Sequence, residues 1–414
     1  MKTLETLFSR SAKMMKASEI RELLKLTRQP EIISFAGGLP NPDAFPVGNI
    51  KKMVDHVMER HARDALQYGT TEGHNKLRAA IVHGMKQIDD VTTDIHNIII
   101  TTGSQEALYL LSKVLLDPGD TVLTAAPTYI GATSTFLAHQ ANIECIPIDE
   151  NGIRVDLLEG ELERMSRRKK LPKFLYLVPS FQNPTGVTIP PDHRSKIYDL
   201  VCQYDLLLVE DNPYGLLCYD GDRVLPIKAQ DTEDRVLFLG TFSKILAPGF
   251  RVAWSCGPAE LVNKMSLAKQ AVDLCSNTFG QYVVYEAIHH NLLFPHVDVI
   301  KRLYKEKRDA MLDAMERYFP KEAKWNIPQG GLFIWVRLPY SINTKDMFPR
   351  AVANNVAYVV GQAFYPDGSG SNTMRLNFSH STNEQIEEGI KRLGMVINDQ
   401  LHKEGLEPEF ITSV

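Results

Sequence analysis

The sequence predicts an α/β fold in which a mostly parallel sheet is sandwiched by helices. Short runs rich in valine, isoleucine and leucine alternate with longer amphipathic stretches between residues 97 and 256. Polar motifs follow these runs, at the edge where parallel sheets bind ligands. The chain has 414 residues, which is long enough for a second, smaller domain.

Near-continuous apolar runs of this length are typical of strands buried on both faces. Seven are present: Asn97–Thr101, Thr121–Ala125, Ile143–Pro147, Phe174–Val178, Leu206–Glu210, Val236–Gly240 and Val252–Cys256. After the first run, Gln105–Leu116 places apolar residues on one helical face. The last two runs are joined by Thr241–Arg251 alone, which is marginal for a helical crossover between parallel strands. We therefore expect a seven-stranded sheet whose seventh strand is antiparallel to the sixth.

Beyond the seventh run, the pattern predicts a long helix around Val299–Tyr318 and strands at Gly331–Leu338 and Thr373–Phe378. These elements indicate a smaller α+β domain. We divide the chain into an N-terminal arm with a helix (1–49) that packs with the small domain, a large ligand-binding domain (50–300) and a small C-terminal domain (301–414).

Composition excludes several classes of protein. The net charge of −4 offers no basic excess for a nucleic acid, and no apolar run is long enough to span a bilayer. The N-terminus lacks the apolar core of a signal peptide, and five scattered cysteines favour a cytoplasmic protein. Without a His-Glu-x-x-His or His/Cys motif, we expect no metal site and place His289-His290 on a helix surface.

Lys244 is the most informative residue. It follows the sixth run, with Thr241 three residues before it and Arg251 seven residues after it. This pattern suits a lysine that holds an aldehyde cofactor as a Schiff base while Thr241 and Arg251 bind the cofactor's phosphate. Only a neutral amine attacks a carbonyl, so such a lysine needs a partly desolvated site. An isolated lysine is more often a solvated surface group.

Polar motifs follow five of the seven runs: Thr102–Gln105, Pro127–Tyr129, Gln182–Gly186, Asp211–Tyr214 and Thr241–Lys244. Arg251 reaches the same edge only if the seventh strand is reversed. Each motif also has a purely structural interpretation. These are a capping box between Thr102 and Gln105, a turn at Asn183–Gly186, a water-facing Asp211, core aromatics at Tyr129 and Tyr214, and an edge-strand position for Arg375.

Together and in this order, the motifs resemble the class I/II aminotransferases, which use pyridoxal 5'-phosphate (PLP) and have fold type I of the aspartate aminotransferase superfamily. The resemblance runs from Ser34–Pro40 to Arg375 and includes Asn-Pro-Thr-Gly, Asp-x-x-Tyr and Ser-Lys-(six residues)-Arg. Ala17–Lys25, followed by Ala-Gly-Gly-Leu-Pro, is similar to the subgroup of 2-aminoadipate and kynurenine aminotransferases.

The resemblance implies a role for each motif residue. Lys244 bonds to PLP and moves the proton at the substrate Cα, and Asp211 pairs with the pyridine nitrogen. Asn183 and Tyr214 contact the phenolic oxygen, and Tyr129 stacks on the ring. The residues expected around the phosphate are Ser104, Gln105, Thr241, Ser243, Arg251 and, from the neighbouring subunit, Tyr68. Those expected to bind substrate are Arg375, Asn183, Gly38 and Arg21.

The implied enzyme is a homodimer with shared active sites. It moves an amino group from 2-aminoadipate, glutamate, or an aromatic or large apolar amino acid to a 2-oxo acid, chiefly 2-oxoglutarate, by a ping-pong mechanism. Arg21 would pair with a distal carboxylate, although it could equally be a solvated partner of Glu19 or Glu22. Two alternatives are a PLP-dependent C–S or β-elimination lyase and, more remotely, the effector domain of a PLP-sensing regulator. The motifs begin near Ser34, so we expect no DNA-binding domain ahead of them.

Overall fold

The computed structural model describes residues 4–9, 12–13, 29 and 31–405. Its largest sheet has eight strands. In spatial order they are β2 (Ile98–Thr101), β9 (Ala253–Cys256), β8 (Val236–Thr241), β7 (Leu207–Asp211), β6 (Phe174–Leu177), β3 (Thr121–Ala126), β4 (Asn142–Asp149) and β5 (Gly152–Ile153). All seven predicted strands are confirmed. The predicted count of seven is wrong by one, because β5 has two residues and is too short to produce an apolar pattern.

The strand directions agree with the prediction. Strands β8, β7, β6, β3 and β4 are mutually parallel, whereas β9 is antiparallel to both of its neighbours, β8 and β2. The reversed strand therefore begins at the edge where the parallel strands end. This places the start of β9, and Arg251 before it, beside the end of β8.

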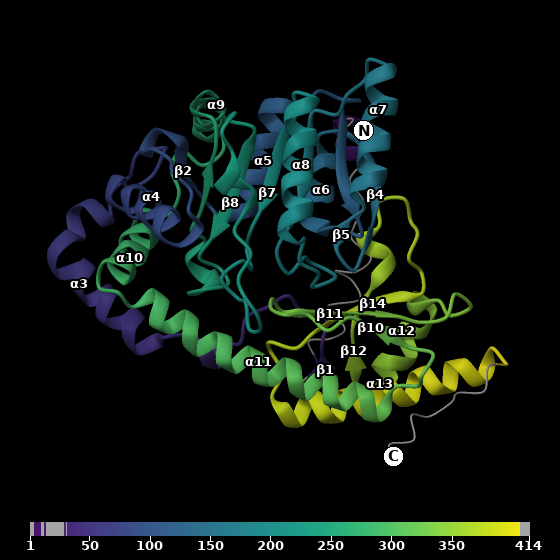
Figure 1. Cartoon of the computed structure of the whole chain (residues 1–414). Helices are drawn as coiled ribbons and strands as arrows, with labels where there is room; N and C mark the ends of the chain where they lie inside the picture. Colours follow the sequence, from purple (N-terminus) through teal and green to yellow (C-terminus); the bar gives the residue numbers. More distant parts are fainter. Residues whose placement is uncertain (1–3, 10–11, 14–28, 30, 406–414) are drawn as a thin grey trace.

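Helices cover both faces of the sheet (Figure 1). They are α3 (Val47–Ala65), α4 (Asn75–Asp89), α5 (Ser104–Leu115), α6 (Ile130–Ala138), α7 (Val155–Arg167), α8 (Pro191–Gln203), α9 (Ala259–Gln270) and α10 (Thr278–His289). Successive strand residues belong to separate apolar clusters: Phe174 packs with α5 and α6, and Leu175 packs with α7 and α8. This alternation explains why the strands are apolar throughout.

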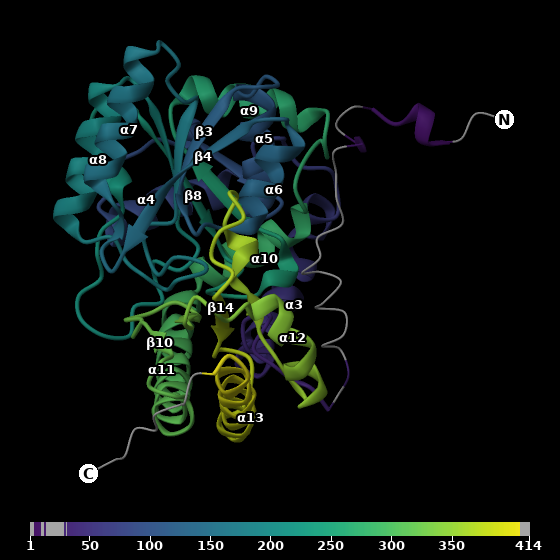
Figure 2. The ribbon, with the colours of Figure 1, turned by 90° about the vertical axis from the view of Figure 1, so that its right-hand side faces the viewer.

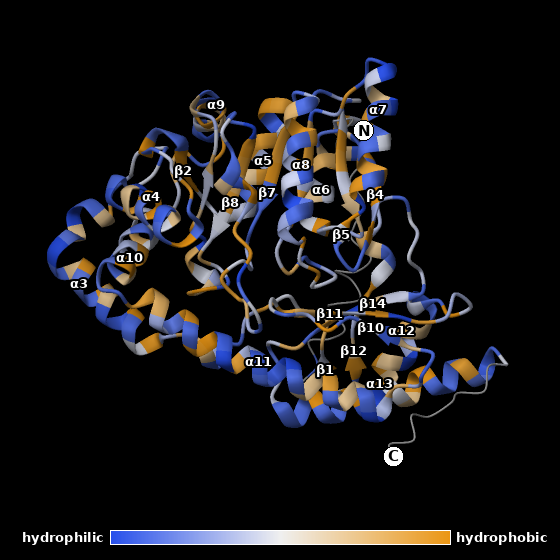
Figure 3. Cartoon of the chain, in the orientation of Figure 1, coloured by the Kyte–Doolittle hydropathy of each residue, from blue (hydrophilic) through white to orange (hydrophobic). Residues whose placement is uncertain are grey.

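The second group of elements contains a four-stranded antiparallel sheet and three helices. The sheet order is β10 (Lys324–Trp325), β11 (Phe333–Arg337), β14 (Thr373–Asn377) and β13 (Val359–Val360). The helices are α11 (Leu293–Tyr318), α12 (Thr344–Ala353) and α13 (Asn383–Lys403). They lie beside this sheet (Figure 2). Helix α11 begins six residues before the predicted stretch and packs along α13. Hydrophilic and hydrophobic residues are mixed along both helices (Figure 3).

The N-terminal segment adds a strand to this second group. Strand β1 (Ile33–Ser34) pairs in parallel with β12 (Val356–Ala357). Short 3-10 helices occur at Leu4–Leu7, Pro42–Ala44, Ile95–Asn97, Ile227–Gln230, Pro248–Phe250 and Gly361–Phe364. The boundaries 1–49, 50–300 and 301–414 remain a proposal about folding units. None of the described helices combines the length and apolar character needed to cross a membrane.

A buried cluster of charges joins α5 to α9. The fully buried Lys269 donates to Glu106 at 2.7 and 2.8 Å and to Asp273 at the same two distances. Glu106 also accepts the backbone N–H of Thr102 at 2.5 Å, and Asp273 accepts the Thr102 hydroxyl at 2.9 Å. The cluster therefore holds the turn from β2 into α5.

We predict that Lys269→Met lowers the free energy of unfolding by about 3 kcal/mol, because the Glu106 carboxylate, which is 9% exposed, loses its buried cation, whereas the more exposed Asp273 can turn to water. Urea unfolding of the variant tests this expectation. Lys264→Met, an exposed lysine on the same helix, is the matched control and should change stability by less than about 0.5 kcal/mol. An unchanged midpoint for Lys269→Met would contradict the assigned role of the cluster.

Candidate active site

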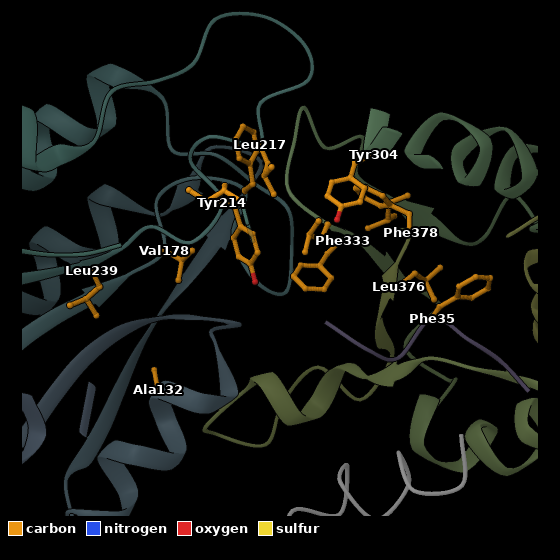
Figure 4. Close-up of a cluster of buried hydrophobic side chains, with 14 of the residues drawn as sticks. Phe35, Ala132, Val178, Tyr214, Leu217, Leu239, Tyr304, Phe333, Leu376 and Phe378 are labelled. Atoms are coloured by element: carbon orange, nitrogen blue, oxygen red, sulfur yellow. The ribbon is translucent and has the colours of Figure 1, made fainter. Parts of the chain in front are cut away.

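The predicted site residues meet at the carboxyl edge of the large sheet. The motifs after β2, β3, β6, β7 and β8 all lie at this edge, since those five strands run in the same direction. The start of β9 reaches it from the opposite direction. The N-terminal segment and β14 approach from the other group of elements, and in Figure 4 Tyr214 faces Phe333 across this junction. Their ring centroids are 5.8 Å apart.

Lys244 lies in the turn after β8 and is partly buried. Its Nζ donates to the backbone oxygen of Gly38 at 2.8 Å. Burial, together with the positive charges of Arg375 and Arg251, lowers the pKa of Lys244 to about 8. A substantial fraction of this lysine is therefore a neutral amine near physiological pH, which is the form that reacts with carbonyl groups and accepts protons.

Asp211 ends β7 and is buried. Its Oδ2 accepts the hydroxyl of Tyr176 at 2.8 Å, while Oδ1 has no partner among the described residues. Burial raises the pKa of Asp211 to about 6, and the Tyr176 hydrogen bond partly opposes this rise. The carboxylate is therefore the main form at neutral pH. The alternative of a water-facing Asp211 is wrong, because the side chain is buried. A buried carboxylate oxygen needs a hydrogen-bond donor, and Oδ1 can accept one.

Arg375 is the buried cation of the site. In β14, which lies between β11 and β13, its Nη1 donates to Asn183 Oδ1 at 2.7 Å and its Nη2 donates to the Ala36 oxygen at 3.0 Å. Burial lowers its pKa to about 10, so it stays protonated at neutral pH. The edge-strand interpretation of Arg375 is wrong.

Two aromatic rings flank the Arg375 guanidinium. Its carbon lies 4.2 Å from the ring centroid of Phe333 and 5.1 Å from that of Phe364. Cation–π contact of this kind stabilises a desolvated arginine without using its hydrogen-bond donors. Nε of Arg375 has no partner among the described residues, so one donor of the fork stays available.

Asn183 and Tyr214 are also buried at this point. The Asn183 side chain accepts from Arg375. Burial raises the pKa of Tyr214, as does Tyr129, while Arg375 and the nearby Asn183 side chain oppose the rise. Tyr214 is therefore a neutral hydroxyl that can donate or accept a hydrogen bond. The plain-turn interpretation of Asn183–Gly186 omits this contact.

A second group of residues is suited to a phosphate. The Thr241 hydroxyl donates to Ser243 Oγ at 3.0 Å, and Ser104 Oγ is buried without a partner among the described residues. Arg251, which has a left-handed backbone (φ 54°), donates to the Thr102 oxygen at 3.4 Å. A Cβ on Gly103 (φ 80°) would lie 2.2 Å from Arg251 Nη2, so only glycine allows this approach. Helix α5 begins here and presents free N–H groups.

Gln105 and Tyr129 differ in detail from their expected roles. The Gln105 side chain turns toward α6 and donates to the Gly131 oxygen at 2.9 Å and to Thr135 Oγ1 at 2.6 Å. Its backbone N–H remains at the start of α5. Tyr129 is half-buried, and its hydroxyl lies 3.4 Å from Gln105 Oε1. The alternative interpretation as a capping box is wrong, because Gly103 is the N-cap and Thr102 bonds to Glu106 and Asp273 instead.

The remaining predicted residues have less support within one chain. Tyr68 lies in the loop between α3 and α4 and is 78% exposed. The backbone oxygen of Gly38 accepts a hydrogen bond from Lys244. A Cβ added to Gly38 would lie 4.0 Å from Arg375 Nη2. Arg21 lies outside the described residues.

Sequence reasoning missed three contributors: Tyr176, Phe333 and Phe364. Tyr176 lies within the apolar run of β6, where its hydroxyl was the only polar signal. The two phenylalanines looked like ordinary core residues. Their contact with Arg375 joins positions that are distant in the sequence, so local spacing could not reveal it.

The site fits PLP on the chemistry of its donors. The unpartnered Asp211 Oδ1 matches the pyridine N–H, and the partly neutral Lys244 matches the aldehyde. Arg251, Thr241, Ser104 and the start of α5 match the phosphate.

Comparisons with known proteins agree with this chemistry. The family model for aminotransferase class I and II matches residues 39–393. The chain is 47% identical to aromatic-amino-acid aminotransferase 1 of Thermococcus litoralis, covering 96% of both chains. It is 39% identical to 2-aminoadipate transaminase of Thermus thermophilus, covering 95% of this chain and 97% of the relative.

Two solved structures have the same fold. Kynurenine aminotransferase of Pyrococcus horikoshii, solved with PMP, superposes with a TM-score of 0.94 at 46% identity, covering 96% of this chain and 98% of that one. The α-aminoadipate aminotransferase of Thermus thermophilus, solved with N-(5'-phosphopyridoxyl)-L-leucine, gives 0.90 at 36% identity, covering 97% and 100%. The chain therefore belongs to the class I and II aminotransferases and is a PLP-dependent enzyme that transfers amino groups between amino acids and 2-oxo acids.

Proposed function

We propose that this enzyme accepts amino groups from several L-amino acids, namely 2-aminoadipate, glutamate, and aromatic or large apolar ones. It passes them to a 2-oxo acid, chiefly 2-oxoglutarate, by a ping-pong mechanism. The observation that carries the proposal is the buried Arg375 fork between two aromatic rings, close enough to Lys244 to lower its pKa. The relatives named for aromatic amino acids and for 2-aminoadipate support this substrate range.

Arg375 binds the α-carboxylate of the substrate. A planar guanidinium can donate two parallel N–H groups to a carboxylate, which fixes the orientation of the amino acid. Asn183 holds the guanidinium from one side through Nη1, and the Ala36 oxygen holds it through Nη2. Phe333 and Phe364 exclude water from its faces, which strengthens the pairing with an anion.

PLP, when bound, supplies a carbonyl carbon that bonds to amines and a pyridine ring that withdraws electrons from the substrate Cα. Asp211 would hold the pyridine N–H through Oδ1, since Tyr176 already occupies Oδ2. Tyr214 would hydrogen-bond the phenolic oxygen, and Tyr129 would stack on the ring. The residues that would hold the phosphate are Ser104, Thr241, Ser243, Arg251 and the backbone at Gln105.

Lys244 moves the proton. Its neutral Nζ would take the proton from the substrate Cα and, once protonated, would act as the acid that returns it. The Gly38 oxygen holds Nζ in place when the lysine is not bonded elsewhere. In a ping-pong reaction the first 2-oxo acid leaves before the second binds, so the same Nζ would serve both half-reactions.

We further propose a homodimer in the cytoplasm. Tyr68 is an aromatic side chain that is 78% exposed, and this exposure supports a role across a subunit interface. The five described cysteines form no disulfide, which supports a reducing compartment.

The first test is a donor panel with 2-oxoglutarate as acceptor. We expect 2-aminoadipate, aromatic and large apolar amino acids to yield glutamate, with parallel lines in double-reciprocal plots at several acceptor concentrations. Omitting the acceptor should limit the product to the amount of enzyme. Continued release of ammonia and pyruvate without an acceptor would favour the lyase alternative instead. Intersecting lines would contradict the ping-pong mechanism.

We predict that acylation of Lys244 in the cofactor-free enzyme rises with pH through an inflection near pH 8, because its pKa is lowered to about 8. Acetic anhydride labelling followed by peptide mass spectrometry measures the rate at this residue. Arg375→Met should move the inflection to higher pH, since it removes a neighbouring positive charge. The exposed Lys264 serves as the internal control in the same digests. An inflection near the ordinary lysine value of about 10.4 would contradict the desolvated site.

We predict that Arg21→Ala lowers kcat/KM for 2-aminoadipate by about 10-fold or more and leaves aromatic donors within about twofold, because only dicarboxylates offer a second anion to pair with an arginine. Steady-state kinetics on both donors provide the comparison. Arg167→Ala, at an exposed position on α7, is the control. Equal turnover of 2-aminoadipate by Arg21→Ala and the parent enzyme would remove Arg21 from the specificity pocket.

A further inference from the structure

A cluster of metal-ligating side chains lies outside the active site, between α3 and α10. His56 and His61 belong to α3, whereas Glu286 belongs to α10 and His290 caps it. The two helices pack against each other, as both ribbon views show (Figures 1 and 2). Nothing in the proposed function uses these side chains.

The distances in the cluster match ligands around a metal better than a direct hydrogen bond. His290 Nε2 and His56 Nε2 lie 3.3 and 3.6 Å from the same oxygen, Glu286 Oε2. A charge-assisted hydrogen bond between such groups would be about 2.7–2.9 Å long. Ligand atoms around tetrahedral zinc, with bonds of about 2.0–2.1 Å, are about 3.3 Å apart. The three ligand atoms all lie within 4.8 Å of one another, so small side-chain rotations reach this spacing.

Burial supports the same conclusion. The Glu286 side chain is only 4% exposed, although it carries a carboxylate. A buried carboxylate is costly unless a cation or several donors compensate it. The histidines around it are 28–43% exposed, which leaves a path for an ion and a water from solvent.

His61 extends the cluster on the other side of the carboxylate. Its Nε2 lies 3.7 Å from Glu286 Oε1, the oxygen opposite the one that faces His56 and His290. A group in this position orients a metal-binding carboxylate without binding the metal, an arrangement common around protein zinc sites.

We propose that His56, His290 and Glu286 bind one divalent transition-metal ion, with water in the remaining position and His61 orienting the carboxylate. Two imidazoles and one carboxylate favour Zn²⁺ over Mg²⁺ or Ca²⁺, which prefer oxygen ligands. The sequence predicted no metal site, because these residues form no motif and come from helices more than 200 positions apart.

The proposed metal clamps α3 to α10, the helix that precedes the Tyr68 loop and the helix that this loop contacts. That loop already lies against α10, since the backbone N–H of His74 donates to Gln281 Oε1 at 2.8 Å. A Cβ on Gly69 would lie 3.0 Å from Thr278 Oγ1, in the first turn of α10. The metal therefore stabilises the element that presents Tyr68.

The test uses the PLP-loaded enzyme, stripped with EDTA and then dialysed against ZnCl₂. We expect one Zn²⁺ per chain by elemental mass spectrometry, visible bands of tetrahedral Co²⁺ on substitution, and a higher Tm with zinc. His56→Asn and His290→Asn should each weaken Zn²⁺ binding by more than about 100-fold, and His61→Asn by about 10- to 100-fold. His96→Asn, a histidine whose side chain is 85% exposed and lies outside the cluster, should bind zinc like the parent.

Two outcomes would overturn the proposal. One is no stoichiometric zinc in the parent enzyme, and the other is equal zinc binding by the parent, His56→Asn and His290→Asn. Circular dichroism and retained PLP absorbance confirm that each variant folds. Because His290 caps its helix with a 43% exposed side chain, His290→Asn alone suffices if His56→Asn fails to fold.

Discussion

An excess of positive charge at the carboxyl edge of one sheet is the constraint on which the rest of the structure depends. Lys244, Arg251 and Arg375 converge there, and Asp211 is the one carboxylate among the predicted site residues. Uncompensated charge is costly where side chains are poorly solvated, as at the buried Arg375. Bound anions would therefore stabilise the site, and in the proposed function a phosphate and a substrate carboxylate supply them. Under that proposal, cofactor and substrate binding follow from the same electrostatic imbalance.

Main-chain oxygens hold these cations without neutralising them. The N-terminal segment passes between the two groups of elements, where the Gly38 oxygen accepts from Lys244 and the Ala36 oxygen accepts from Arg375. The same segment is tied to the second group, because the backbone N–H of Asn377 donates to the Phe35 oxygen at 2.9 Å. A carbonyl oxygen fixes the position of a cation but carries no net charge, so the cation can still attract an anion. Lys244 and Arg375 are therefore held in place without losing their attraction for a ligand.

Around the large sheet, charged side chains also connect helices that are distant in the sequence. Lys269 joins α9 to the turn that carries Ser104, and the histidine cluster joins α3 to α10. The turn proposed to bind the phosphate and the helices that flank the Tyr68 loop thus have contacts outside the site.

The sequence by itself determined the seven main strands, the reversal of β9 and the gathering of Lys244, Asp211 and Asn183 at one edge, because apolar periodicity and loop length act locally. Tertiary structure alone decided the two-residue β5, the side-chain direction of Gln105, the aromatic rings around Arg375 and the histidine cluster. Each of these depends on which distant surfaces pack together. Local spacing encodes how a segment folds, but the partner of a buried side chain is chosen only when helices and sheets meet.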